Sequence, residues 1–212
     1  MKRFITLLAA WLMLFCVAGC KKQEENSSAS TAEDDTFVVG MECNYAPFNW
    51  TQTNASETAV EIADGSGYAD GYDVRNAQKI ADGLGKKLVI EKIDWDGLTQ
   101  AVRSGKIDAI IAGMSPTEER KATIDFTDPY YETGVVIVVK KDSTYAAADS
   151  LDDFAGAKIT GQMNTYHYTV IDQIAGVEKE SAMADFPSMI VALRSGAIDG
   201  YIADTNSAQA AL

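Results

Sequence analysis

Residues 101–113 read AVRSGKIDAIIAG, and residues 192–204 repeat this pattern as ALRSGAIDGYIAD. Eight of the thirteen positions are identical. Each copy has the pattern of a helix end, a Ser-Gly turn and a buried strand. The shared Ser-Gly-x-Ile-Asp core could be no more than a favourable turn into a strand. The identity extends beyond that core, however, and favours two lobes built on the same α/β plan, since the copies lie too far apart for a tight solenoid.

The residues before the first copy alternate between strand and helix patterns. The expected strands are 37–40, 88–90 and 107–112, and the expected helices are 73–84 and 98–103. Asp73 is the expected N-cap of the first helix, and Gly85 is where that helix should stop. Residues 44–71 are polar and glycine-bearing, which indicates a long loop or hairpin. The β-α-β-α-β order predicts an α/β fold with a mostly parallel sheet and helices on both faces.

The ends of the two repeated strands are the expected ligand site, because open parallel sheets bind ligands just past the carboxyl ends of their strands. These ends are Gly113-Met114-Ser115 and Asp204. Ser115 could cap a helix that has Pro116 at its first position and Glu118 completing a capping box. Such a helix start attracts an anion, and the planar guanidinium of Arg120 suits a carboxylate. A capped surface helix with a solvated Arg120 is the open alternative.

Asp204 supplies the opposite charge. A carboxylate at the end of the apolar strand 201–203 is costly unless it meets a cation. An anion site on one lobe and a carboxylate on the other together fit a zwitterion. The aromatic residues in or beside the irregular loop could wall a pocket or pack as core and rim; they are Tyr45, Phe48, Trp50 and Tyr72.

Composition excludes several classes of function. A net charge of −13 and a pI near 4.4 argue against nucleic acid as a partner. The single His167 removes most zinc and serine-hydrolase arrangements, so we expect no metal and no cofactor. Cys43 could be a nucleophile, but a small buried thiol is the favoured interpretation.

The first twenty residues have the pattern of an export signal: Lys2 and Arg3, an apolar run over 4–15, and small residues up to Cys20. The sequence Val-Ala-Gly-Cys at 17–20 resembles the bacterial lipoprotein cleavage box, in which the cysteine becomes the lipidated first residue; ordinary cleavage with Cys20 incidental is the alternative. Residues 21–35 have no large apolar residue and are expected to form a disordered tether.

Several motifs in fixed order resemble the family 3 amino-acid-binding proteins of ABC transporters, which have the two-lobed type 2 periplasmic binding fold. The motifs are Tyr-Ala-Pro-Phe at 45–48, Gly-Tyr-Asp-Val at 71–74, Trp-Asp-Gly-Leu at 95–98, Gly-x-Ile-Asp at 105–108, Gly-Met-Ser-Pro-Thr-Glu-Glu-Arg at 113–120 and Ile-Asp-Phe-Thr-Asp-Pro-Tyr at 124–130. The resemblance runs from about Phe37 to the last residue. It implies a receptor that captures a free amino acid between two lobes.

The resemblance also implies roles for single residues. Arg120, with the backbone of Ser115 and Thr165, would hold the ligand α-carboxylate. The Gly113 carbonyl, the Ser115 hydroxyl and Asp204 would hold the α-ammonium group. Met114 is a further family position, next to Gly113 and Ser115. Tyr45 and Tyr72 would flank the ligand, and Glu42 would be the acid that senses its side chain. The other side of the ligand would be lined by Gly161, Gln162 and Asn164, with Gly161 leaving space.

The expected domains are the signal at 1–20, the tether at 21–35, lobe 1 at 36–137 and lobe 2 at 138–212. The loop over 51–68 is longer than the family's usual hairpin. Family members also continue back into the first lobe after the position of Asp204, and this return is expected to be missing here.

The expected partners are a small-molecule amino acid, a transporter permease and, through a lipid at Cys20, the extracellular face of a bacterial membrane; we expect a monomer and no nucleic acid. The alternatives are an enzyme on the same fold, similar to cyclohexadienyl dehydratase and using Glu42, His167 and Asp204, or the sensing domain of a signalling receptor. Which amino acid binds stays open.

Overall fold

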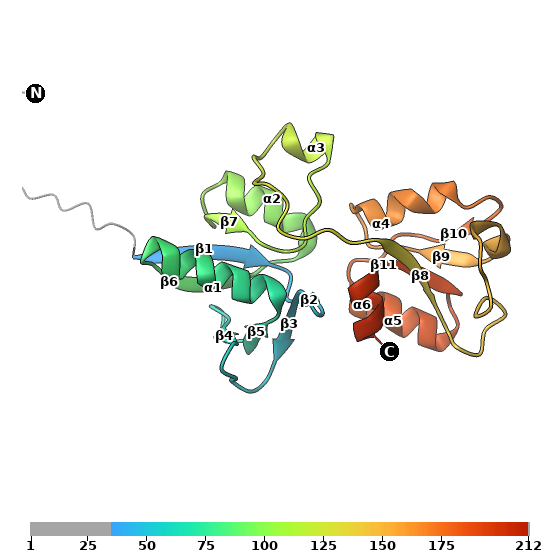
Figure 1. The fold of residues 1–212 in the computed structure, drawn as a ribbon, viewed down its shortest axis with the longest axis horizontal. Coiled ribbons are helices and arrows are strands. Elements are labelled where there is room, and N and C mark those ends of the chain that lie inside the picture. The colour runs from blue at the N-terminus through green and yellow to red at the C-terminus, as the bar shows by residue number, and fades with distance from the viewer. Residues whose placement is uncertain (1–34, 212) are drawn as a thin grey trace, which may run out of the picture. The chain divides into compact units, whose positions relative to one another are not determined.

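The computed structural model of the chain describes residues 35–211 (Figure 1). The predicted signal, Cys20 and nearly all of the predicted tether lie outside the described residues. Within the described residues, none of the helices is both long and apolar enough to cross a membrane.

Strands and helices alternate over most of the described chain. The strands are β1 (Thr36–Met41), β2 (Asn44–Tyr45), β3 (Asn49–Gln52), β4 (Val60–Glu61), β5 (Tyr68–Asp70), β6 (Lys87–Lys92), β7 (Ala109–Ile110), β8 (Val135–Val139), β9 (Lys158–Thr160), β10 (Glu178–Lys179) and β11 (Gly200–Asp204). The α-helices are α1 (Tyr72–Leu84), α2 (Trp95–Arg103), α3 (Glu118–Lys121), α4 (Tyr166–Thr169), α5 (Phe186–Ser195) and α6 (Thr205–Ala210), and the 3₁₀-helices are η1 (Leu151–Phe154) and η2 (Val170–Gln173).

The first sheet has the strand order β6-β1-β7, and both of its pairings are parallel. Helix α1 packs against β6 and β1, while α2 packs against β1 and β7. Val39 and Ile90 are fully buried in this core. The predicted β-α-β-α-β order is therefore confirmed, although the strand expected over 107–112 is regular only at Ala109–Ile110.

Helix α1 differs from the prediction at its start. It begins at Tyr72 after Gly71, so the expectation that Asp73 is the N-cap is wrong. Asp73 is fully buried in the first turn and accepts side-chain hydrogen bonds from distant residues instead. The end is as predicted, because Gly85 adopts the left-handed conformation (φ 67°) in which glycine ends helices without strain.

Residues 44–71 form an antiparallel sheet with the order β2-β3-β5-β4, which supports the hairpin alternative rather than the loop. Asp70 organises the polar part, since its carboxylate accepts hydrogen bonds from the hydroxyls of Ser56 and Thr58 at 3.0 Å. Ile62 anchors the segment to the first sheet through a bridge to Ile90.

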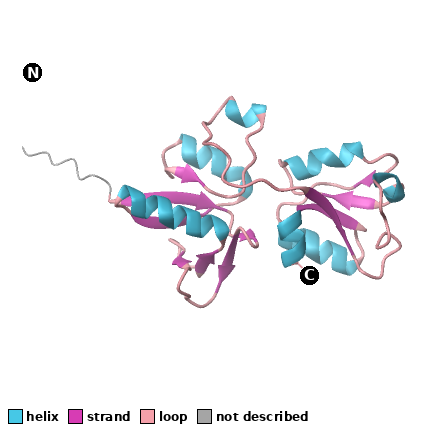
Figure 2. Ribbon diagram, in the orientation of Figure 1, coloured by secondary structure: helices cyan, strands magenta, loops and turns pink. Residues whose placement is uncertain are grey.

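The second sheet has the order β10-β9-β11-β8, with β8 antiparallel to β11 and the other pairs parallel. Figure 2 shows helices on both sides of it, with α4 on one side and α5 and α6 on the other. The lobe boundary at residue 137 remains a prediction; β8, which spans that residue, belongs entirely to the second sheet.

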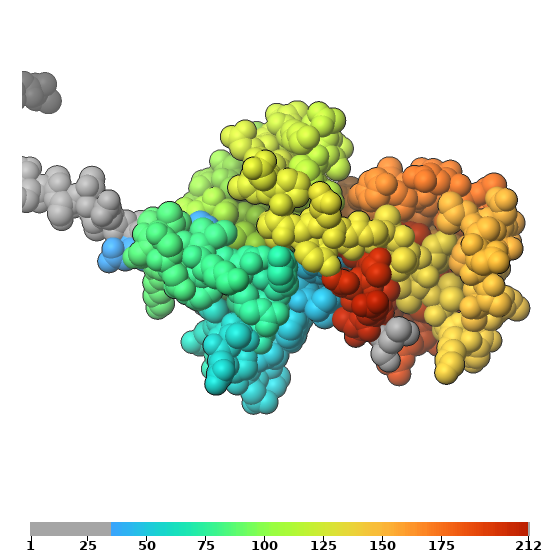
Figure 3. All heavy atoms as spheres, viewed as in Figure 1, coloured from blue at the N-terminus to red at the C-terminus, as the bar shows by residue number. Residues whose placement is uncertain are grey.

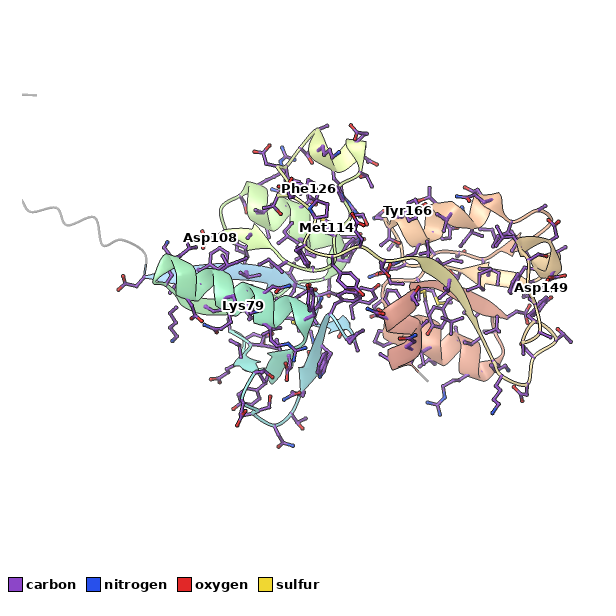
Figure 4. The ribbon with its side chains drawn as sticks, in the orientation of Figure 1. Lys79, Asp108, Met114, Phe126, Asp149 and Tyr166 are labelled. Atoms are coloured by element: carbon purple, nitrogen blue, oxygen red, sulfur yellow. The ribbon has the colours of Figure 1, made fainter. Side chains whose placement is uncertain are left out.

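The two sequence repeats form the same pair of reciprocal hydrogen bonds in the two sheets. The backbone N–H of Val38, in β1, donates to the Asp108 carboxylate at 2.8 Å, and that of Lys158, in β9, donates to the Asp199 carboxylate at 2.9 Å. In return, each aspartate's own N–H donates to the carbonyl of the same partner at 2.8 Å. The shared aspartate therefore fixes a neighbouring strand in each sheet, a role that the sequence analysis did not assign. Asp108 is labelled in Figure 4.

Candidate ligand-binding site

A cavity of about 600 Å³ gathers most of the predicted site residues. Those that line it are Glu42, Tyr45, Gly113, Met114, Ser115, Arg120, Gln162, Thr165 and Asp204. They come from β2, from α3, from the N-cap of α4 and from the ends of β1, β7, β9 and β11 or the turns that follow them. Figure 4 labels four residues of the cavity lining: Met114, which was predicted, and Asp108, Phe126 and Tyr166, which were not. Three predicted site residues do not line the cavity: Tyr72, Gly161 and Asn164.

Arg120 lies at the cavity wall, half-buried, on the short helix α3. Its guanidinium donates to the carbonyls of Ser115 and Asn164, each at 2.8 Å, and stacks over the Trp95 ring at 5.1 Å. Burial lowers the pKa of this guanidinium, which its neighbour Glu119 opposes. No carboxylate among residues 35–211 forms an ion pair with Arg120, so its charge is available to an anion in the cavity.

The start of α3 corrects the predicted cap. Thr117, rather than Ser115, is the N-cap, and its hydroxyl accepts from the Arg120 N–H at 3.3 Å. The helix has only four residues, so its dipole is small and the guanidinium carries most of the positive charge at this wall. Ser115 is left with its hydroxyl free of any capping role.

Asp204 ends β11 on the opposite wall, as predicted from the repeat. Its carboxylate accepts a short hydrogen bond from the Tyr45 hydroxyl and lies 3.5 Å from Nε2 of His167. Burial, followed by the charge of Asp204, raises the pKa of Tyr45, so this phenol stays a donor. The Tyr45 ring also packs on Phe186, with centroids 4.5 Å apart. The Asp204 carboxylate, which was expected to need a cation, therefore lies beside the Tyr45 phenol and the His167 imidazole.

Glu42 forms the buried end of the cavity and is only 6% exposed. The side-chain amide of Gln162 donates to both carboxylate oxygens, at 2.9 and 3.1 Å. Burial raises the pKa of Glu42 to about 7; the Gln162 hydrogen bond opposes this rise, and nearby acids, first among them Asp185, add to it. Among the described residues no cation forms an ion pair with this carboxylate.

The predicted residues outside the cavity lining have other contacts. The Tyr72 hydroxyl donates to the Tyr130 carbonyl at 3.2 Å. The Asn164 side chain donates to Asp96 at 2.8 Å, and the Asn164 carbonyl accepts from Trp95 at 3.3 Å as well as from Arg120. Asn164 thus holds Arg120 and Trp95 rather than facing the cavity.

The expectation that Gly161 leaves space in the pocket is wrong. A Cβ built on Gly161 would lie 2.9 Å from backbone atoms of His167 and Tyr168. The backbone of α4 therefore fills the space beside this glycine, and close packing rather than ligand volume explains the absence of a side chain.

Among the cavity residues that had not been predicted as ligand contacts, Trp95, His167 and Phe186 contact predicted ones: Arg120, Asp204 and Tyr45. Trp95 stands in a motif that was recognised, but its stacking on Arg120 joins residues from separate helices. His167 was considered only for acid–base chemistry. Phe186 had no signal beyond the apolar pattern of its helix.

Cys43 is a buried thiol, 1% exposed, as the favoured interpretation expected. Burial raises its pKa to about 12. Because the thiolate is the nucleophilic form, this thiol is unsuited to catalysis at neutral pH.

The sequence pattern of the bacterial extracellular solute-binding proteins, family 3, matches residues 37–157. The chain belongs to this family. A probable histidine-binding protein of Campylobacter jejuni is 31% identical over 211 residues, which cover 99% of this chain and 76% of that protein. A solved structure of an ancestral arginine-binding protein bound to glutamine is 35% identical with a TM-score of 0.70, covering 83% of this chain and 72% of that one.

These relatives support a two-lobed periplasmic-binding fold and a role in binding a solute outside the cytoplasm. They are named as binding proteins rather than enzymes. A third similar structure, at 27% identity and a TM-score of 0.71, is an ancestral amino-acid-binding protein described as a precursor of cyclohexadienyl dehydratase; the match covers 83% of this chain and 73% of that one.

Proposed function

We propose that the chain is the lipid-anchored substrate-binding subunit of an amino-acid ABC transporter and that its ligand is an amino acid with a cationic side chain. The observation that carries the ligand class is Glu42, a buried carboxylate at the cavity end that has an amide partner but no cation in the described chain. A buried acid of this kind is stabilised in its ionised form by a positive charge.

The charges of the cavity fit this ligand. Arg120 would bind the α-carboxylate together with backbone N–H groups of Ser115 and Thr165, because a planar guanidinium pairs with both oxygens of a carboxylate. Asp204, the Gly113 carbonyl and the Ser115 hydroxyl would bind the α-ammonium group. Arg120 and Asp204 are then neutralised by the zwitterion.

With those two charges neutralised, Glu42 remains, and a neutral side chain would leave it unpaired. A cationic side chain would pair with it while Gln162 continues to donate to the same carboxylate. Tyr45, Met114 and Trp95 line the walls between the two ends. Tyr72, which lies outside the lining, would act on the rim.

Ligand capture would involve the two lobes, 36–137 and 138–212. A ligand that contacts Arg120 on one lobe and Asp204 on the other gains both sets of contacts only when the lobes are closed, so it favours the closed state by differential affinity. The closed form would then be presented to the permease.

A thermal-shift survey of the twenty amino acids tests this function. A ligand present at 100 times its Kd stabilises the fold by about 2.7 kcal/mol, which raises the melting temperature by roughly 5 °C or more. We expect a shift with arginine, lysine or histidine that is lost in Arg120→Ala. Arg194→Ala, at an exposed residue of α5, is the matched control and should keep the shift. No shift with any amino acid would contradict the proposal.

The lipid anchor rests on the sequence around Cys20 and has its own test. Labelled palmitate should be incorporated into the wild-type chain and not into Cys20→Ala, which should be released from the extracellular face of the membrane. Equal incorporation in both would contradict the anchor while leaving amino-acid binding untouched.

An enzyme on the same fold is the second candidate. It is favoured by the pair of His167 and Asp204, 3.5 Å apart in the cavity, which could exchange a proton with a bound acid. Turnover of prephenate by the wild-type chain, absent in His167→Gln, would support it; the absence of turnover with retained amino-acid binding would exclude it.

A further inference from the structure

Four hydrogen bonds form a continuous chain that begins outside the cavity lining at Cys43 and ends within it at Tyr130 and Gly113. The backbone N–H of Cys43 donates to Asn49 Oδ1 at 2.8 Å, and Asn49 Nδ2 donates to Asp73 Oδ2 at 2.8 Å. From the other side, the Tyr130 hydroxyl donates to Asp73 Oδ1 at 2.8 Å, and the backbone N–H of Gly113 donates to the Tyr130 oxygen at 3.1 Å. Asp73 therefore stands in the middle, with both of its oxygens occupied.

The two ends of this chain are the two turns that carry ligand-site residues. Cys43 directly follows Glu42 after β1, and Gly113 directly precedes Met114 and Ser115 after β7. These turns belong to neighbouring parallel strands, but no regular sheet pairing extends as far as either turn. The hydrogen-bond chain is a connection between them that runs through side chains.

The turn after β1 also needs an external constraint. Cys43 has a φ of 58° and Gly113 a φ of 62°, so both adopt the left-handed conformation. For Cys43 this conformation is unfavourable and persists only where the surroundings hold it. The N–H of each of these residues is bonded to the chain that centres on Asp73.

The central residues are placed to resist movement. Asn49 and Asp73 are both fully buried. Asp73 lies in the first turn of the thirteen-residue helix α1, where the helix dipole favours a negative charge. Tyr130 comes from the segment that follows α3, which lies on the surface of the face shown in Figure 3 (yellow). The residue is 43% exposed, while its hydroxyl reaches inward to Asp73.

We propose that Asp73 and Tyr130 are positioning residues of the ligand site, which hold the turns after β1 and β7 so that Glu42 and the Gly113–Ser115 backbone face the ligand together. The role rests on the proposed function for its ligand. It does not require either residue to touch that ligand, and neither was among the predicted site residues.

Tyr130→Phe in the full chain is the direct test, since it removes one oxygen and keeps the ring. Tyr168→Phe is the matched control, because its hydroxyl also makes a hydrogen bond to protein, to the Glu180 carbonyl at 3.1 Å, but lies outside the cavity lining. Calorimetric titration with L-arginine, amide hydrogen exchange by NMR and the melting temperature are measured for both variants.

In Tyr130→Phe we expect the Gly113 amide to exchange faster and the Kd for arginine to rise about tenfold, which corresponds to about 1.4 kcal/mol. Tyr168→Phe should leave both unchanged, even if its melting temperature falls as much. In Asp73→Asn, where one of the two oxygens becomes a donor, the amides of Gly113 and Cys43 should both exchange faster.

Unchanged Gly113 exchange in Tyr130→Phe would overturn the proposal, and so would an equal loss of arginine affinity in Tyr168→Phe. If the wild-type chain binds no arginine, lysine or histidine, the proposed ligand class is wrong, but hydrogen exchange at Gly113 and Cys43 still decides whether Asp73 and Tyr130 hold the two turns.

Discussion

Glu42→Gln is expected to stabilise the folded chain at high pH and to weaken its binding of cationic amino acids. The substitution removes the charge and keeps the shape, and the new side chain can still accept a hydrogen bond from Gln162. Glu42 therefore offers a case in which a binding residue lowers the stability of the fold that carries it.

The expected gain in the free energy of unfolding follows from the pKa of Glu42. Burial raises this pKa from 4.5 to about 7, a difference that corresponds to about 3 kcal/mol. Because the folded chain binds this proton more tightly than the unfolded chain does, the free energy of unfolding falls as the pH rises from 4.5 to about 7. Glutamine does not titrate, so relative to the wild type the variant gains up to about 3 kcal/mol between pH 4.5 and pH 8.

Urea denaturation of the wild type and Glu42→Gln at pH 4.5 and pH 8 measures this gain. Glu61→Gln, at an exposed position of β4, is the control and should show no pH-dependent difference. The same samples, titrated with L-arginine at pH 8, should show a Kd that is about 10- to 100-fold higher in Glu42→Gln, because a hydrogen bond to a charged group contributes about 1.5–3 kcal/mol. A stability difference that is the same at both pH values would refute the reasoning about burial, and an unchanged Kd would refute the assigned contact.

Three further outcomes are expected. Arg120→Lys keeps the charge but loses the planar pair of donors, so the Kd for L-arginine should rise at least tenfold by calorimetry; an unchanged Kd would argue against a bidentate carboxylate contact. Gly161→Ala should lower the free energy of unfolding by about 1–3 kcal/mol in urea, because the added Cβ meets backbone at 2.9 Å; an unaltered value would mean that α4 lies further away. The Cys43 thiol should resist alkylation at pH 8 until urea unfolds the chain, as followed by peptide mass mapping, because it is buried with a pKa raised to about 12; rapid labelling of the folded chain would contradict this.

The repeated sequence was enough to predict the α/β plan of the fold and to single out two positions that line one cavity. The pattern is local: each copy joins a helix end, a turn and a strand. Gly113, three residues after β7, and Asp204, at the end of β11, both line the cavity. The end of helix α1 at Gly85 could also be predicted, because a glycine that follows the apolar face of a helix is a local signal.

The failures concern residues whose partners are distant in the sequence. Asp73 looked like an N-cap because capping residues and buried acids are the same residue types, and its partners Asn49 and Tyr130 lie 24 and 57 positions away. Gly161 was expected to leave space on the basis of the family resemblance, and its contacts with the backbone of His167 and Tyr168 in α4 depend on tertiary packing. The residues themselves indicated an anion site at Arg120 and a cation partner for Asp204. The role of Glu42 came from the family resemblance, since neither composition nor periodicity distinguishes it from a surface acid.

Calorimetric titration of the wild-type chain with L-arginine, L-citrulline and agmatine at pH 8 tests the central proposal most directly. Citrulline replaces the cationic end with a neutral one of the same shape, and agmatine lacks the α-carboxylate. Saturable one-to-one binding of arginine, with both analogues bound at least tenfold more weakly, is the predicted result. Equal binding of arginine and citrulline would contradict the role of Glu42, and equal binding of agmatine would contradict that of Arg120. No binding of any of the three, nor of lysine or histidine, would contradict the cationic ligand itself.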